Sequence, residues 1–137
     1  MMYYAVIDTN VLVSAMLKSS SIPGTILKEA LVGKITPLLN SEILCEYQEV
    51  LCREKFSFPK DTVDILMDGL IRRGVFIDAK PIVELIPDPK DVVFYAVVME
   101  ARKIDAAYLV TGNLKHFPIK SFVVTPKEMQ EILDADT

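Results

Sequence analysis

The chain has 137 residues, of which 51% are hydrophobic and 25% charged, so it can build one domain with a real core and is not compositionally disordered. Its formal net charge of −4 argues against a generic nucleic-acid binder, although a cluster of acids that binds divalent metal would contribute to that total. No repeat, low-complexity tract or linker interrupts residues 1–137, which are therefore expected to form a single domain.

Apolar runs alternate with amphipathic stretches, a pattern that predicts an α/β fold with a parallel sheet. The first apolar run, over 3–7, has the β-branched composition of a buried central strand and ends at Asp8. The expected elements follow in chain order: a strand over 3–7, helices over 9–18 and 23–32, a strand over 35–39, helices over 42–53 and 60–73, a short strand over 75–77 or 82–84, a helix over 89–102, a strand over 107–110, a turn or short helix over 112–117, a strand over 122–124 and a helix from 126.

Several residues mark the ends of these elements. Pro23 stands at a first-turn position that favours proline, and Gly33 is a stop signal for the helix that Pro23 opens. Ser41 is expected to cap the helix that follows it. Thr125 and Glu128 have the spacing of a capping box at the start of the last helix.

The two cysteines are expected to be buried, reduced thiols. Cys45 and Cys52 lie seven residues apart in one predicted helix, a spacing too long for an intrahelical disulfide. No third or fourth soft ligand accompanies them, which argues against zinc. The sequence has neither a leader with charged and apolar regions nor a stretch approaching the ~20 apolar residues of a membrane span. We therefore expect a soluble, cytoplasmic protein without membrane contact.

Polar residues stand where open parallel sheets bind ligands, at the carboxyl ends of strands. Asp8 ends the first strand, and Glu46 lies in the first turns of the helix after the second. Asp88 and Asp91 open the helix before the fourth strand, and Asn113 lies just past that strand. Converging carboxylates repel one another unless protons or cations neutralise them, and hard oxygen ligands suit Mg²⁺ or Mn²⁺. A metal site that activates water is therefore one interpretation of this set.

Each of these residues also has a structural interpretation. Asp8 could cap the next helix, Glu46 could belong to a solvated helix face, and Asn113 could be an ordinary turn residue. Asp88 precedes proline and can serve as an N-cap. His116, the only histidine, is alone more typical of a structural or surface residue than of a ligand, and no Ser-His-Asp set accompanies it.

Four segments, in this order, carry a family resemblance: Val6-Ile7-Asp8-Thr9-Asn10-Val11-Leu12-Val13, then Ser41-Glu42-Ile43-Leu44-Cys45-Glu46-Tyr47, then Asp88-Pro89-Lys90-Asp91-Val92-Val93-Phe94-Tyr95-Ala96, and finally Leu109-Val110-Thr111-Gly112-Asn113 with Phe117-Pro118. Together they resemble the motifs of the PIN-domain nucleases, including the VapC-type toxins of bacterial and archaeal toxin–antitoxin pairs. The resemblance covers essentially the whole chain. It implies a three-layer α/β/α sandwich with a five-stranded parallel sheet.

The resemblance also implies an activity. It predicts a metal-dependent endoribonuclease, using Mg²⁺ or Mn²⁺, that hydrolyses RNA phosphodiester bonds through a metal-activated water. Asp8, Glu46 and Asp91 match the catalytic, metal-binding acids. Asn113 takes a fourth ligand position that is aspartate in many relatives. Its carbonyl oxygen can ligate but adds no charge, so a second metal is expected to bind more weakly and a one-metal mechanism becomes more plausible.

Further residues receive supporting roles by the same resemblance. Thr9 and Asn10 would shape the loop beneath the metal, and Thr111 would orient the acids or the phosphate. Asp88 stands beside Asp91 as a neighbouring acid. Two more, Lys115 and His116, would lie near the mouth of the site and contact RNA phosphates, or would simply be solvated surface.

The implied partners are an RNA substrate, an antitoxin protein and a second copy of the chain in a homodimer. Antitoxin segments of such systems lay an amphipathic helix in a groove and place a basic residue in the acidic site. The negative charge of that site attracts the basic residue. The apolar positions around Ile65, Leu66, Leu70 and Ile71 either form a surface that contacts a partner or belong to the hydrophobic core.

Two other classes of function remain alternatives. Haloacid-dehalogenase-type phosphatases need a second acid two residues after the first, where this chain has Asn10. A response-regulator receiver would use Asp78 as the phosphoacceptor, but the first strand offers it only Asp8. These two belong to one class, phosphoaspartate chemistry. The second class is a catalytically degenerate PIN-like module that binds RNA or protein, which Asn113 keeps open.

Overall fold

The computed structural model describes residues 3–136 and contains one five-stranded sheet in the order β3-β2-β1-β4-β5. All neighbouring strands pair in parallel. The strands are β1 (Tyr3–Ile7), β2 (Ile35–Leu39), β3 (Val75–Phe76), β4 (Ala107–Val110) and β5 (Val123–Val124). The predicted parallel sheet is confirmed. Of the two candidates for the short strand, the segment that begins at Val75 joins the sheet and 82–84 does not.

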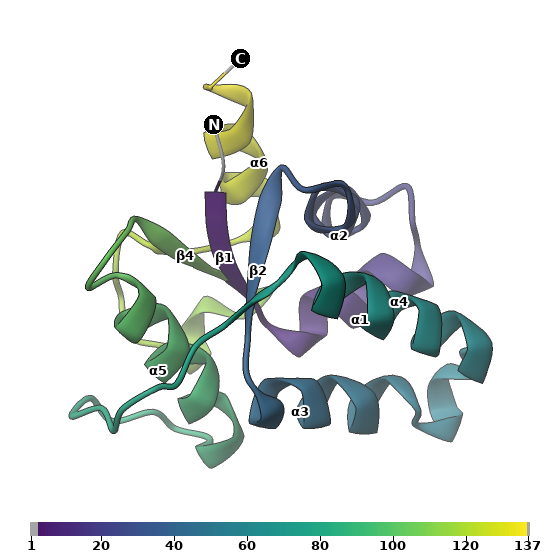
Figure 1. Ribbon diagram of the computed structural model, residues 1–137, viewed down its shortest axis with the longest axis horizontal. Coiled ribbons are helices and arrows are strands. Elements are labelled where there is room, and N and C mark those ends of the chain that lie inside the picture. The colour runs from purple at the N-terminus through teal and green to yellow at the C-terminus, as the bar shows by residue number, and fades with distance from the viewer. Residues whose placement is uncertain (1–2, 137) are drawn as a thin grey trace.

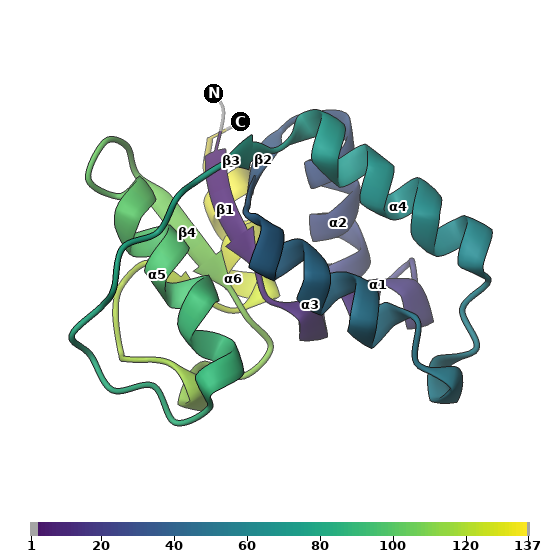
Figure 2. The same cartoon turned by 60° about the horizontal axis from the view of Figure 1, so that its bottom comes forward.

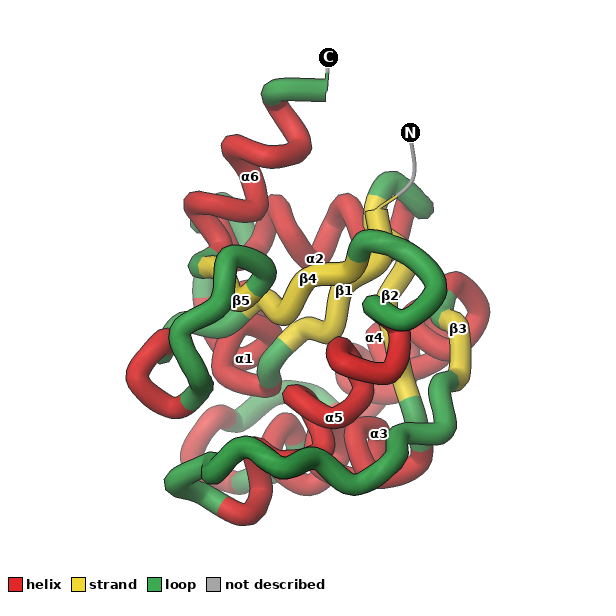
Figure 3. Tube along the Cα trace, turned by 90° about the vertical axis from the view of Figure 1, so that its left-hand side faces the viewer, coloured by secondary structure: helices red, strands yellow, loops and turns green. Residues whose placement is uncertain are grey.

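Six α-helices surround this sheet: α1 (Thr9–Leu17), α2 (Ile22–Val32), α3 (Ser41–Leu51), α4 (Lys60–Arg73), α5 (Val92–Ala101) and α6 (Pro126–Asp134). Three single 3₁₀ turns connect them: η1 (Glu54–Phe56), η2 (Pro89–Asp91) and η3 (Leu114–His116). In Figure 1, α5 lies on the opposite side of the strands from α2 and α4. Figure 3 shows the strands side by side with α5 in front of them. The predicted three-layer α/β/α arrangement is confirmed.

The sheet is covered on both faces, which explains why its strands are continuous apolar runs. All five residues of β2 are buried. The packing of α5 against β1, β2 and β4 buries most of that short helix, including Phe94 and Tyr95. The capping box of Thr125 and Glu128 starts α6 as predicted, and Gly33 ends α2 with a φ of 98° that a side chain would strain.

The structure corrects several local predictions. Asn40, not Ser41, caps α3, because its side chain accepts a hydrogen bond from the Ile43 amide at 2.9 Å. The helix predicted over 89–102 is divided into η2 and α5. Both cysteines are free, as predicted, but they are exposed rather than buried, because α3 turns a different face toward the core.

The apolar positions of α4 divide between core and surface. Leu66 and Leu70 are buried, whereas Ile65 and Ile71 are exposed on the outer face. None of the helices within residues 3–136 combines the length and apolar character that crossing a membrane requires.

The strand order places a topological switch point between β1 and β4. From β1 the chain moves outward through β2 to β3, and then returns to β4 on the other side of β1. Ligands of open α/β sheets bind at the carboxyl ends of the strands that flank such a point. Figure 2 shows the tip of β1 beside α1 and α3. This is the end of the sheet at which the sequence predicts the site.

Candidate active site

A cavity of about 430 Å³ opens at the carboxyl end of β1. Elements far apart in the sequence line it: the residues after β1, the middle of α3, the η1 turn, η2 and the η3 turn. Its lining includes seven residues predicted for the site or its surroundings: Asp8, Thr9, Asn10, Glu46, Asp88, Asp91 and His116. The fold therefore brings together the three acids that the sequence singles out.

Asp8 is buried at the end of β1 and occupies the N-cap position of α1, yet its side chain makes no capping hydrogen bond. Its Oδ2 instead accepts hydrogen bonds from the Thr111 hydroxyl at 2.8 Å and from Asn10 Nδ2 at 3.2 Å. Burial raises the pKa of Asp8, and the Thr111 hydrogen bond partly offsets this shift. The structural interpretation of Asp8 as a simple helix cap is therefore wrong.

The residues after β4 hold this carboxylate in place. Thr111 is fully buried, and its Oγ1 also accepts a hydrogen bond from the Asn113 amide at 3.0 Å. The Gly112 amide donates to Asn10 Oδ1 at 3.0 Å. A Cβ on Gly112 would approach that same oxygen to 3.3 Å, so glycine suits the close contact between the two strand ends.

Among the three acids, Asp91 has the pKa that its surroundings shift most. Burial raises its pKa to about 6, and the negative charges of Asp8, Asp88 and Glu46 add to the shift, while His116 opposes it. Its Oδ2 is buried and makes no hydrogen bond to any residue that the structure describes. A carboxylate held among like charges, with an oxygen that lacks a donor, favours the uptake of a proton or a cation.

Asp88 has the structural role that its place before proline predicts. It caps η2, and its Oδ1 accepts a hydrogen bond from the Lys90 amide at 3.0 Å. Its charge nonetheless acts on the site, because it raises the pKa of Asp91.

His116 stands between Asn113 and Asp91. Its Nδ1 lies 3.3 Å from Asp91 Oδ2, a distance for an ion pair when the ring is protonated, but without the geometry of a hydrogen bond. Its Nε2 lies 2.9 Å from Asn113 Nδ2. Asn113 is thus turned toward His116 and is not among the residues that line the cavity. Its role as a metal ligand stays a prediction.

Glu46 reaches the cavity because its helix is fixed against β1 from the inside. The next residue, Tyr47, is buried, and its hydroxyl donates a hydrogen bond to the carbonyl oxygen of Ile7, directly before Asp8. The Tyr47 ring packs 6.3 Å from Phe94 of α5, three residues beyond Asp91. Burial and the charge of Asp8 raise the pKa of Tyr47, so its hydroxyl keeps its proton as a donor.

The sequence reasoning missed several residues of the cavity wall. Arg53 and Phe56, after α3, and Lys90, between Asp88 and Asp91, line it beside the acids. Arg53 and Lys90 place positive charge next to the carboxylates. An RNA-binding site would require such charge to attract the phosphates. In the sequence, the only hint is that these basic residues lie close to the predicted acids. Lys115, predicted for the mouth of the site, is exposed and does not line the cavity.

The oxygen atoms that face the cavity are of the type that a hard divalent cation prefers as ligands. They are carboxylate oxygens, together with the hydroxyl of Thr9, which is buried and has no hydrogen-bond partner within residues 3–136. Across the same residues, however, no three Asp, Glu, His or Cys side chains already form a group that could hold a metal ion. An ion bound by all three acids would therefore draw their side chains closer together.

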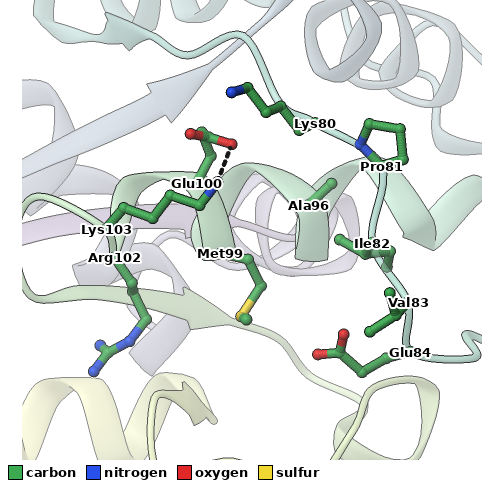
Figure 4. A pocket seen from close by; sticks show the side chains of 10 residues that line it. All are labelled: Lys80, Pro81, Ile82, Val83, Glu84, Ala96, Met99, Glu100, Arg102 and Lys103. Atoms are coloured by element: carbon green, nitrogen blue, oxygen red, sulfur yellow. Dashed lines mark hydrogen bonds and ion pairs between the residues drawn. The ribbon is translucent and has the colours of Figure 1, made fainter.

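A second cavity, of about 380 Å³, lies between α5 and the segment over 80–84 (Figure 4). Its wall includes Met99, Ile82 and the ion pair between Lys103 and Glu100, whose atoms are 3.1 Å apart. It contains none of the predicted site residues. The chemistry that the sequence predicts therefore belongs to the cavity at the end of β1.

Comparisons with known proteins bear on the family and the fold of the chain. The family model for the PIN domain matches residues 4–115, a range that includes all three acids. The chain is similar to the crystal structure of VapBC2 from Rickettsia felis bound to a DNA fragment from their promoter, with a TM-score of 0.56 and 19% identity over 88% of this chain and 96% of that chain. At that identity the likeness concerns the fold alone. No curated protein matches the chain.

The family model covers most of the sequence. The chain therefore belongs to the PIN domain family.

Proposed function

We propose that this protein is a metal-dependent endoribonuclease that hydrolyses phosphodiester bonds of RNA. The observation that carries the proposal is the meeting of Asp8, Glu46 and Asp91 in one cavity, where burial and like charge raise the pKa of Asp91 to about 6. Membership of a nuclease family supports the same reaction class. The proposal gives these acids the role of holding Mg²⁺ or Mn²⁺, with Asn113 as a weaker fourth ligand.

Each side chain has a distinct task in this proposal. A bound divalent ion would supply the acidity that makes water nucleophilic at neutral pH and would neutralise charge on the phosphate. Asp8 would hold its position through Thr111 and Asn10. Asp91 would offer the buried Oδ2 that has no hydrogen-bond donor among the described residues. Arg53 and Lys90 would attract the RNA backbone toward the acids.

We further propose that the protein is the toxin of a toxin–antitoxin pair that acts on cytoplasmic RNA. The support is the resemblance to VapC-type sequences and the likeness of its fold to a VapBC structure. An antitoxin would place a basic residue in the acidic cavity. The exposed Ile65 and Ile71 on α4 offer apolar surface for a homodimer or an antitoxin helix.

The alternative is a degenerate module that binds RNA or protein without cleaving it. The specific observation in its favour is the position of Asn113, which faces His116 rather than the cavity. RNA cleavage by purified protein separates the two. The nuclease cleaves single-stranded RNA with Mn²⁺ and stops when Asp8 is changed to Asn, whereas the module cleaves nothing and keeps its binding in that variant.

A further inference from the structure

The connection between α3 and α4 carries a pair of aromatic rings that the metal chemistry does not use. Phe56 and Phe58 stack with ring centroids 5.5 Å apart and planes inclined by 11°. Ser57, between them, has a φ of 54° and is the one non-glycine residue within 3–136 with a positive φ. A left-handed backbone costs free energy for a residue with a side chain. This turn therefore keeps an unfavourable conformation that brings the two rings together.

One ring of this pair, Phe56, lines the cavity that contains the acids. Phe56 and Arg53 line that cavity together with Asp8, Glu46 and Asp91. Phe56 is only partly buried, so part of this residue remains accessible to a ligand. A group that stacks on Phe56 would lie next to a phosphate bound at the carboxylates.

The charge around these rings differs from that of the whole protein. Residues 53–60 contain three basic side chains and one acidic side chain, in a chain with a net charge of −4. Lys55 Nζ lies 5.1 Å from the centre of the Phe56 ring, where the negative face of the ring attracts a cation. Among the described residues Lys55 has no carboxylate partner. The pair between Arg53 and Glu49, at 3.4 Å, is exposed and therefore weak.

We propose that Phe56, backed by Phe58, is a platform on which an unpaired base of single-stranded RNA stacks, while Lys55 and Arg53 contact the adjoining phosphates. This inference rests on the proposed function, because it names the form of RNA that the same site takes. Aromatic rings interleaved with basic side chains are typical of surfaces that bind single-stranded nucleic acid. A base offers its face for stacking on a side chain only where it is not enclosed in a duplex. Lys55 would leave the ring when the base arrives.

The test measures RNA affinity separately from cleavage. The Asp8→Asn protein is titrated into short single-stranded RNAs that carry the fluorescent base 2-aminopurine at one position each. We expect strong quenching at one position, and we expect the added Phe56→Leu change to remove it and to weaken binding on the order of tenfold. The matched control is Phe76→Leu, an exposed phenylalanine of β3 outside the cavity, which leaves both readouts unchanged.

Two further variants separate stacking from damage to the fold. Phe56→Trp keeps an aromatic face and restores affinity and quenching, whereas a ring needed only for packing would not be rescued by a larger side chain. Lys55→Gln lowers the slope of log affinity against log salt by about 0.7, the contribution of one phosphate contact to a single strand.

Cleavage of the same RNA by the wild type with Mn²⁺ tells the two proposals apart. If the wild type cleaves nothing but its RNA binding depends on Phe56, the nuclease proposal fails and the stacking platform stands. If the wild type cleaves RNA, and Phe56→Leu changes neither KM nor quenching, the platform is overturned and the nuclease proposal stands. The latter result would leave the ring pair as a surface for a protein partner.

Discussion

The hydroxyl of Thr111 donates a hydrogen bond of 2.8 Å to Asp8 Oδ2, and so joins the ends of β4 and β1 across 103 residues of sequence. The Asp8 carboxylate is thereby held at the switch point of the sheet. A carboxylate oriented by a buried neighbour loses less freedom when it binds a cation, so this hydrogen bond would favour the metal binding that we propose for Asp8.

Changing Thr111 to Val should therefore weaken metal binding while keeping the fold. The change keeps the side-chain shape but removes the hydrogen bonds to Asp8 and from Asn113, which we expect to cost roughly 1–2 kcal/mol of stability. We expect Mn²⁺ affinity, measured by calorimetry, to fall on the order of tenfold. Thr25→Val in α2, which removes a hydroxyl bonded to the Ser21 carbonyl, is the control. Equal effects of the two changes would contradict the role of Thr111.

Changing Asp91 to Asn should stabilise the metal-free protein at neutral pH. The folded-state pKa of Asp91 is raised to about 6 from 3.8, so the folded protein binds this proton more tightly than the unfolded chain does. The ionised group therefore destabilises the fold above pH 6, and that loss disappears as the pH falls from 6 toward 4. We expect the variant to raise Tm by roughly 3–5 °C at pH 7.5, the shift that about 1 kcal/mol produces in a domain of this size.

The measurement is thermal unfolding in the presence of EDTA from pH 4 to pH 8. The difference in Tm between Asp91→Asn and the wild type should shrink as the pH falls. Asp64→Asn, an exposed residue of α4 paired with Lys60 at 3.1 Å, should show no such gain. A variant at Asp91 that is less stable than the wild type at pH 7.5 would show that the carboxylate stabilises the fold.

Glu46→Gln should lower the pKa of Asp91, because the charge of Glu46 is one of the causes that raise it. Titration of the Asp91 carboxyl by NMR would show the shift, and Mn²⁺ affinity should fall by at least about tenfold if Glu46 is a ligand. Glu42→Gln, one turn earlier on α3 and outside the cavity, is the matched control. An unchanged Asp91 titration in Glu46→Gln would place Glu46 too far from the site to act on it.

Tyr47→Phe removes the hydroxyl that joins α3 to the carbonyl of Ile7, and leaves that carbonyl with one donor fewer. We expect a loss of about 1 kcal/mol in the free energy of unfolding and a weaker affinity for Mn²⁺, because Glu46 and Asp8 lose a common anchor. The control is Tyr108→Phe on β4, whose ring packs 6.5 Å from Tyr3. If Tyr47→Phe loses stability but keeps its full Mn²⁺ affinity, Tyr47 supports the core and not the site.

The sequence predicts the sheet well because buried strands leave a local pattern, whereas the role of the acids stays a prediction. Buried parallel strands are apolar runs, and Asp8 follows such a run directly. The helix boundaries are less certain, since Asn40 and Ser41 are both good caps and only the folded geometry selects Asn40. The prediction that the cysteines are buried is wrong because Ile43 and Tyr47 define the buried face of α3, and the thiols lie on another face.

Some features of the site depend on local conformations that the residue types do not fix. Phe56 lies in the η1 turn and lines the cavity, and the next residue, Ser57, has a φ of 54°, a conformation that its residue type does not predict. The direction of Asn113 depends on His116, three residues later, whose ring can face several ways. No periodic pattern in the sequence indicates the conformation of Ser57 or the direction of Asn113, so only the structure could reveal them.

The proposed function requires that Asp8 and Asp91 bind a divalent metal for RNA cleavage. The most direct test titrates Mn²⁺ by calorimetry into the wild type and into the Asp8→Asn/Asp91→Asn variant, and incubates the same samples with a mixed RNA pool. We expect binding and cleavage in the wild type and the loss of both in the variant. Wild type and variant that behave alike, in binding and in cleavage, would contradict the proposed function and show that these carboxylates have a structural role.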